Sequence, residues 1–372
     1  MKKRLFSAAM AVALATVSLA ACGGGSTAAT TAAPAETQAA AAETEAAAAE
    51  TEAAAETEAT APAAAGEAEY VIKLGHTLNE DTPGHKAFLD FEKDVEEKSG
   101  GRIDIEIYPN SALGTERVMF EQCQMGTLEI AYGTSSVLAN FDKNLKILDL
   151  PFLFSNEEDA REAINGELGD AAIKDLESYG LKKFTWMENG IRHVTNSQRP
   201  INTPDDLKGL KIRTMENDIH MSSFSHLGAS PTPMAFTELF TALQQKTVDG
   251  QENPLYLIVS NRLYEPQKYL SLTGHFYTTG IATINLDFWN SLPEDLQQIL
   301  MDSIDMAREK QYEYCDEQTA EALEFLKGAI EVNEITPENH QLFVDATADV
   351  YNEVEAEVGT ELMDVVRKVV AE

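Results

Sequence analysis

The strongest constraint on the fold is a helical pattern that runs from Pro293 to Gly328 with no glycine or proline between them. A helix of this length would measure about 50 Å, which exceeds the diameter of a small domain. We therefore expect the helix to lie across two lobes. The length of 372 residues agrees with two domains.

The rest of the folded part alternates between strand and helix patterns, which is typical of a mainly parallel α/β sheet. The segments expected to be strands are YVIKLGH, RIDIEIY, LEIAY, KFTWM, RHVTN, KIRTM, KYLSLTG, GIATINLD and IEVNEI, with SPTPM as a loop. The expected helices cover residues 83–98, 114–125, 221–227, 236–245 and 293–328, and a helical region starts at 337. This order predicts two α/β lobes, joined by strands that act as a hinge, with a ligand cleft between them.

The N-terminus has the pattern of an export signal. Lys2, Lys3 and Arg4 precede a small-residue-rich apolar run that ends at Ala20 and is too short to span a membrane stably. The sequence LAAC, ending at Cys22, resembles a bacterial lipobox. The resemblance implies a signal peptide over residues 1–21 and a lipid anchor on Cys22; the alternative is an ordinary signal peptide cut near an A-x-A site.

Residues 26–65 consist almost wholly of Ala, Thr, Glu and Pro, without an aromatic or large aliphatic residue. Such a segment has too little apolar surface to pack a core. We expect residues 22–66 to be a lipidated, disordered tether with a reach on the order of 40 Å.

The chain is strongly acidic, with 62 acidic and 28 basic residues and a formal net charge of −34. Nine acids and three bases lie in the first 69 residues, so most of the excess belongs to the folded part. This charge excludes a nucleic-acid partner. It also repels small anions at long range, so an anion receptor would need positive charge concentrated in its cleft.

The sequence contains no recognisable enzyme, metal or cofactor motif. HExxH, G-x-S-x-G, P-loop and GxGxxG patterns are absent, and the seven histidines are scattered. Cys123 and Cys315 lack CxxC or zinc-type neighbours, and we predict two buried free thiols rather than a disulfide. We therefore expect a non-enzymatic protein without metal or cofactor.

Several long motifs occur in order along the folded part. They are NGIRHVTNSQRPI, DDLKGLKIRTMEN, GASPTPMAFTELFTALQQKTVDGQENP, LGHTLNEDTPGH, YPNSALGTER, DLPFLF and LPEDLQ. Over residues 70–370 the sequence closely resembles the DctP-type receptors of tripartite ATP-independent periplasmic (TRAP) transporters. The resemblance implies a type II-like periplasmic-binding-protein fold, with lobe I over 67–189 plus 278–317 and lobe II over 190–277 plus 318–372.

The resemblance also implies roles for residues in these motifs. Arg213 would bind the solute carboxylate, which suits the planar fork of a guanidinium; the alternative is a structural ion pair with Glu216. Arg192 would either contact the solute or support Arg213. Asn253 would contact the solute through its amide, and Phe236 would line the cleft unless it is an ordinary core residue.

Candidate residues on the other lobe match the family less closely and follow the carboxyl ends of predicted strands. They are His76, Thr77, Glu116, Thr134 and Ser135, and on the Arg213 lobe we add Asn217. Sialic-acid receptors carry an Asn where Thr77 stands and an acid where Thr134 stands, which argues against sialic acid.

Glu116 would be a poor neighbour for a second carboxylate unless it pairs with Arg117 or His76, but it could accept sugar hydroxyls. We therefore expect a uronate or aldonate, with a C4-dicarboxylate as the second possibility.

The function expected from this resemblance is an extracytoplasmic, lipid-anchored receptor. It would capture a small organic acid, close around it and deliver it to small and large TRAP membrane subunits. A lipoprotein that senses the same ligand for a signalling receptor is the alternative. The sequence leaves open whether the protein is a monomer or a dimer.

Overall fold

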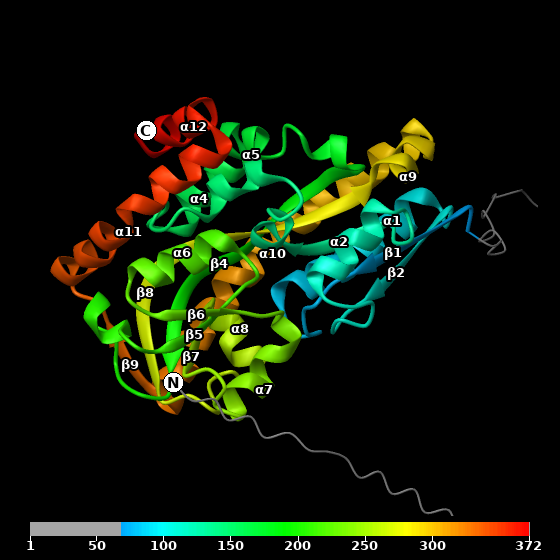
Figure 1. The fold of residues 1–372 in the computed structure, drawn as a ribbon. Coiled ribbons are helices and arrows are strands. Elements are labelled where there is room, and N and C mark those ends of the chain that lie inside the picture. The colour runs from blue at the N-terminus through cyan, green and yellow to red at the C-terminus, as the bar shows by residue number, and fades with distance from the viewer. Residues whose placement is uncertain (1–67, 372) are drawn as a thin grey trace, which may run out of the picture. The chain divides into compact units, whose positions relative to one another are not determined.

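The computed structural model describes residues 68–371, which form an α/β fold around one mixed sheet (Figure 1). The predicted signal peptide, the lipidation of Cys22 and the tether over residues 22–66 lie outside the described residues. Among the described helices, none is both long and apolar enough to cross a membrane.

The sheet has the strand order β2-β1-β3-β8-β4-β7-β5-β6, and β9 pairs with β8. In chain order the strands are β1 (Tyr70–Gly75), β2 (Ile103–Tyr108), β3 (Ile130–Thr134), β4 (Leu181–Asn196), β5 (Lys211–Thr214), β6 (Ser230–Pro233), β7 (Gly250–Asn253), β8 (Tyr269–Asn285) and β9 (Glu331–Glu334). β1, β2 and β3 are mutually parallel and form what we call the first half-sheet. β5, β6 and β7 are also parallel and form the second half-sheet.

Two long antiparallel strands, β4 and β8, join the half-sheets. β8 pairs with β3 on one side, β4 pairs with β7 on the other, and the two pair with each other along most of their length. The predicted hinge strands and two-lobe α/β fold are therefore confirmed.

The prediction of separate strands within β4 and β8 was wrong. The register irregularity at Glu188 and Gly190 is absorbed inside β4, where Gly190 has a φ of 107°. A bulge of this kind bends a strand without ending it.

The SPTPM segment, expected to be a loop, contains β6. This strand lies at the edge of the sheet and pairs only with β5 among the described strands. Pro231 and Pro233 are compatible with this position because an edge strand leaves one row of backbone N–H groups without a required partner.

The helices cover both faces of the sheet (Figure 1). The α-helices are α1 (Pro83–Ser99), α2 (Glu116–Gln124), α3 (Ser135–Leu138), α4 (Glu157–Asn165), α5 (Glu167–Ala172), α6 (Asp218–His226), α7 (Leu239–Gln244), α8 (Leu255–Ser260), α9 (Leu286–Ser291), α10 (Glu294–Ala329), α11 (Pro337–Val358) and α12 (Thr360–Ala371). The 3₁₀ helices are η1 (Lys143–Asp149), η2 (Leu176–Tyr179), η3 (Pro204–Leu207) and η4 (Phe236–Glu238).

The long helix α10 spans the structure as predicted. It contacts α1, which packs beside the first half-sheet, and also α8 and β9 on the side of the second half-sheet. Its buried residues, including Leu300 and Leu326, belong to one hydrophobic core with Phe88 and Phe91 of α1. Burial of this apolar stripe fixes α10 against both half-sheets.

A second core includes Phe120 of α2, Leu168 of α5 and Val366 of α12. α12 contacts α5 and η1, so the end of the chain packs beside segments that follow β3. Cys123 and Cys315 are both buried free thiols, which confirms the prediction. Burial raises the pKa of the Cys123 thiol to about 12, so it stays protonated.

Candidate functional site

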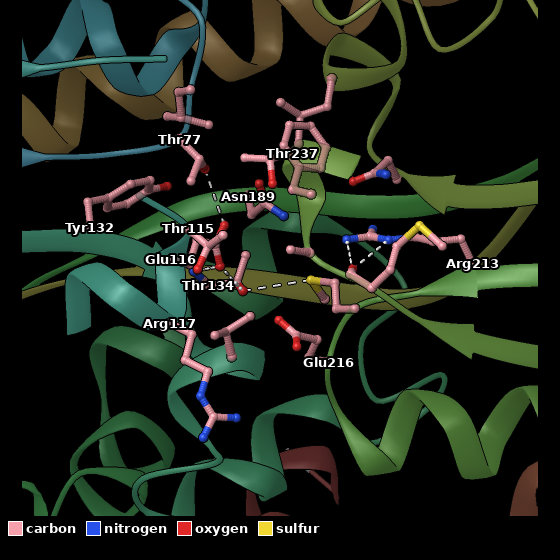
Figure 2. Close-up of a pocket in the computed structure, with 18 of the residues that line it drawn as sticks. Thr77, Thr115, Glu116, Arg117, Tyr132, Thr134, Asn189, Arg213, Glu216 and Thr237 are labelled. Carbon is pink, nitrogen blue, oxygen red and sulfur yellow. Dashed lines mark hydrogen bonds between the residues drawn. The ribbon is translucent and has the colours of Figure 1, made fainter. Parts of the chain in front are cut away.

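A cavity with about 620 Å³ of empty space, part of it open to solvent, lies between the two half-sheets. Its walls come from the carboxyl ends of parallel strands on both sides: Thr77 after β1, Thr134 at the end of β3, Met215 after β5 and Asn253 at the end of β7. Two parallel half-sheets facing each other in this way gather strand-end side chains at one place. Figure 2 shows Glu116 and Arg213 on opposite sides of the cavity.

Arg213 reaches the cavity from β5 and is only 1% exposed. Its Nε and Nη2 atoms donate hydrogen bonds to the Met234 carbonyl oxygen at 3.0 and 2.7 Å. The Nη1 atom is buried and has no hydrogen-bond partner among residues 68–371. Burial lowers the pKa of Arg213 to about 10, so the side chain keeps its charge at neutral pH. The alternative ion pair with Glu216 is not formed in the described structure.

Arg192 lies in β4 and is held by Glu252 of β7, and both side chains are 0% exposed. Nε donates to Glu252 Oε2 at 2.5 Å, and Nη2 donates to Glu252 Oε1 at 2.9 Å and to Asn253 Oδ1 at 3.1 Å. Burial opposes ionisation of Glu252, but Arg192 and nearby histidines hold the pKa of this carboxyl well below its usual range. The Arg192 charge is therefore compensated within the protein.

One nitrogen of Arg192 nevertheless stays free to donate. Its Nη1 atom is buried without a partner in the described chain, as is the amide nitrogen of Asn189. Both residues line the cavity together with Arg213. Three buried N–H groups that lack partners thus lie around one space, and a buried donor without a partner destabilises the structure unless a ligand or water accepts its hydrogen bond.

The opposite wall presents carboxylate oxygens. Glu116 is the first residue of α2, and its Oε2 atom accepts hydrogen bonds from Thr134 N at 3.1 Å and Thr134 Oγ1 at 2.8 Å. Its Oε1 atom accepts from Thr77 Oγ1 at 3.4 Å. A negative charge at a helix N-terminus is also favourable. Glu116 is half-buried, and the structure brings it together with Thr77 and Thr134 as predicted candidates.

Neither basic partner considered for Glu116 pairs with it. Arg117 pairs with Glu121 at 3.2 Å, and His76 Nε2 lies 3.2 Å from His85 Nδ1. Glu116 therefore lines the cavity without a basic partner among the described side chains.

Two further predicted residues line the cavity. Asn253 donates from Nδ2 to Gln251 Oε1 at 2.5 Å and accepts from Arg192, so both of its polar atoms have protein partners. The Phe236 ring lines the cavity, with the Arg213 guanidinium carbon 6.0 Å from its centroid. Phe236 is half-buried and packs only partly against the core.

His76, Ser135 and Asn217 are not among the residues that line the cavity. His76 is buried and stacks on Phe88, and burial lowers its pKa to about 3. Asn217 caps α6, and its Nδ2 atom donates to Ser136 O at 2.9 Å and to Asp149 Oδ2 at 2.8 Å. The polar groups of His76 and Asn217 are therefore used within the protein, whereas the Ser135 hydroxyl is buried without a partner in the described chain. Because none of the three residues lines the cavity, we leave them out of the proposed solute contacts.

Sequence reasoning missed Glu252, Asn189 and Tyr132 at the site. Glu252 and Asn189 both lie inside motifs that were singled out, and a buried acid directly before Asn253 was a signal for a partner of Arg192. Tyr132 lines the cavity from β3, and burial keeps its hydroxyl protonated by raising its pKa. No group of His, Cys, Asp and Glu side chains within residues 68–371 could hold a metal ion.

Comparisons with known proteins agree with this geometry. The family model described as bacterial extracellular solute-binding protein, family 7 (DctP), matches residues 74–357. The 2,3-diketo-L-gulonate-binding periplasmic protein YiaO of Escherichia coli K12 is 34% identical over 276 residues, which cover 74% of this chain and 84% of YiaO. The C4-dicarboxylate-binding protein DctB of Bacillus subtilis 168 is 31% identical over 297 residues, which cover 79% of this chain and 85% of DctB.

A solved TRAP periplasmic solute-binding protein from Polaromonas sp. JS666, bound to D-erythronate, superposes with a TM-score of 0.77. It is 37% identical, and the match covers 81% of this chain and 98% of that protein. The chain therefore belongs to the DctP family of bacterial extracellular solute-binding proteins, the extracytoplasmic receptors of TRAP transporters, which bind solutes rather than transform them.

Proposed function

We propose that the cavity captures one hydroxylated organic acid of the aldonate or uronate type and that Arg213 binds its carboxylate. The observation that carries this proposal is the set of three buried donors without described partners: Arg213 Nη1, Arg192 Nη1 and Asn189 Nδ2. A carboxylate with a neighbouring hydroxyl supplies acceptors for all three. Arg213 Nη1 would add a charge-assisted bond to the carboxylate.

The charge distribution favours a single carboxylate in the solute. Arg192 is neutralised by Glu252, so Arg213 is the one buried cation that lines the cavity without a carboxylate partner in the described chain. Glu116 and Glu216 face the same space. Solute hydroxyls would donate to these carboxylates, whereas a second solute carboxylate would be repelled by them.

The relatives support both solute classes considered. YiaO and the erythronate-bound protein bind sugar acids, and DctB binds C4-dicarboxylates. Glu116 has no basic partner in the described chain, which favours a sugar acid as the solute of this protein. A C4-dicarboxylate remains the second candidate.

Closure around the solute is the proposed route to delivery. The solute would contact residues of both half-sheets only when the cleft is closed, so binding shifts the population toward the closed form. Membrane subunits of the transporter would then recognise that form. For this motion we keep the proposed lobes, 67–189 plus 278–317 and 190–277 plus 318–372.

We also propose that Cys22 carries a lipid anchor. The support is the LAAC sequence and the tether composition that follows it. Expression of the full chain with a labelled fatty acid should give a labelled, membrane-associated protein, and Cys22→Ser should abolish the label. A labelled Cys22→Ser variant, or an unlabelled natural chain, would contradict this anchor.

A thermal-shift screen of organic acids tests the solute class. A ligand at 100 times its dissociation constant adds about 2.7 kcal/mol to the unfolding free energy, which gives a clear rise in the midpoint temperature. We expect aldonates and uronates to raise the midpoint more than succinate or malate. Stabilisation by dicarboxylates alone would overturn the sugar-acid assignment, and turnover of any bound acid would overturn the receptor assignment.

A further inference from the structure

A chain of buried polar groups outside the cavity lining connects the two sides of the cleft. His220 of α6, after the second half-sheet, places Nε2 3.3 Å from Oδ1 of Asp149, at the end of η1 on the other side. His220 Nδ1 lies 3.9 Å from Glu252 Oε1, and Glu252 holds Arg192 at the cavity. His220, Asp149 and Glu252 are all buried.

Neighbouring contacts reinforce the same junction. Asp149 also accepts from Asn217 Nδ2 at 2.8 Å and from the Ser136 hydroxyl. Asn140 Nδ2 donates to the Glu216 carbonyl oxygen at 2.7 Å. The N-terminus of α6 is thus docked onto the segment that follows β3, and His220 is the titratable donor in this contact.

We infer that Asp149 and His220 form a latch between the lobes that holds when His220 is protonated and weakens when it loses its proton, so that solute affinity falls as pH rises. This inference rests on the proposed function, because it concerns closure around the same solute. Protonated His220 lies between Asp149 of one side and Glu252 of the other, so its charge favours the closed arrangement. Neutral His220 can still donate from Nε2 to Asp149, but it loses the positive charge that attracts both carboxylates, since Nδ1 at 3.9 Å from Glu252 makes no hydrogen bond.

The surroundings of His220 define the direction of the effect. Burial lowers its pKa, but Asp149 and Glu252 outweigh burial and raise it above the ordinary value. The charged or titratable groups facing it are Asp149 from η1 and Glu252 from β7, and Glu252 is shared with Arg192 of β4 and His275 of β8. The Phe276 ring stacks on His220 with centroids 4.0 Å apart and supplies no charge.

The raised pKa of His220 determines how the stability of the closed state changes with pH. A group with a raised pKa in the folded, closed state contributes stabilisation that is complete below the ordinary histidine value of about 6.5 and is lost as pH rises through the raised value. Other buried histidines would not mimic the effect. Burial lowers the pKa values of His76 and His193 to about 3, so these two stay neutral near neutral pH. Burial lowers the pKa of His275 as well, and a lowered pKa gives a pH dependence of the opposite sign.

The test is calorimetric titration of the acid identified by the screen between about pH 6 and pH 9, where a carboxylate solute with a pKa near 4 stays fully ionised. We expect the dissociation constant of the natural protein to rise about tenfold, equivalent to about 1.4 kcal/mol. His220→Gln should bind weakly at pH 6 and show no slope. His226→Gln, a surface histidine beside Glu353, should keep the natural slope.

A constant affinity for the natural protein across this range, or an unchanged slope in His220→Gln, would overturn the latch. If no acid binds at any pH, the proposed function fails instead. The latch is then tested by measuring the unfolding free energy of the protein without solute. The difference in unfolding free energy between the natural protein and His220→Gln should then shrink as pH rises, and a difference independent of pH would contradict the inference.

Discussion

The two walls of the cavity are built differently. On the wall beside the second half-sheet, Arg213 and Arg192 extend from strands, are buried, and are held by a backbone carbonyl and by buried Glu252. On the opposite wall, Glu116 and Thr77 lie at a helix start and in a loop, and their mutual contact is a long 3.4 Å hydrogen bond. Rigid strands fix the group that recognises a carboxylate, whereas loop and helix ends provide the contacts that distinguish one acid from another.

The largest expected effect is a difference between the two walls in how far a substitution lowers the unfolding free energy. Glu252→Gln leaves the buried Arg192 cation without its countercharge, which should lower the unfolding free energy by about 3 to 5 kcal/mol. Glu116→Gln on the other wall should change it by under about 1 kcal/mol, because Gln keeps an acceptor for Thr134. Urea denaturation measures both, and equal losses would remove the contrast between the walls.

The next effect concerns the carboxylate anchor. Arg213→Ala should weaken solute binding by about 2 to 4 kcal/mol, because one partner of a buried charge pair is lost. Arg213→Lys should recover only part of this affinity, since an ammonium lacks the planar fork. Calorimetry gives both values, and a loss below about 1 kcal/mol for the alanine variant would refute the assigned role.

A smaller effect should appear on the other wall as a change in selectivity. Glu116→Gln removes a negative charge that accepts solute hydroxyls, which should weaken sugar-acid binding by about 1 kcal/mol and strengthen dicarboxylate binding. Glu97→Gln, which removes an exposed acid of α1 outside the cavity lining, is the control and should leave the ratio of the two affinities unchanged. If the Glu116 variant keeps the natural ratio of sugar-acid to dicarboxylate affinity, this carboxylate does not contribute to solute selectivity.

The smallest effect tests whether surface charge matters. Lys211 is exposed at the start of β5, and Lys211→Gln should change solute affinity by under about 0.5 kcal/mol. Solvent and salt screen an exposed charge, whereas the buried Arg213 is screened much less. A loss comparable to that of Arg213→Ala, measured in the same titration, would mean that the cavity is not the main source of positive charge for the solute.

Much of the fold was accessible from local patterns. The long helix, the parallel strands and the two-lobe arrangement follow from periodicity and from glycine and proline positions. The rule that ligands bind at strand carboxyl ends found Thr77 and Thr134 but also selected His76. Adjacent residues of an extended chain point to opposite sides, and the side chain of His76 turns toward Phe88. Asn217 was selected with Arg213, but its amide caps α6 and binds Asp149.

The sequence by itself determined the alternation of strands and helices, the long helix, the family, and the residue types that meet a carboxylate. Only the tertiary structure decided which of the two arginines keeps an uncompensated charge. Glu252 lies 60 residues beyond Arg192 and meets it through the pairing of β7 with β4. Periodicity and motif spacing report on neighbours along the chain. The balance of charge in a buried site depends on pairs that come together only when the sheet has formed.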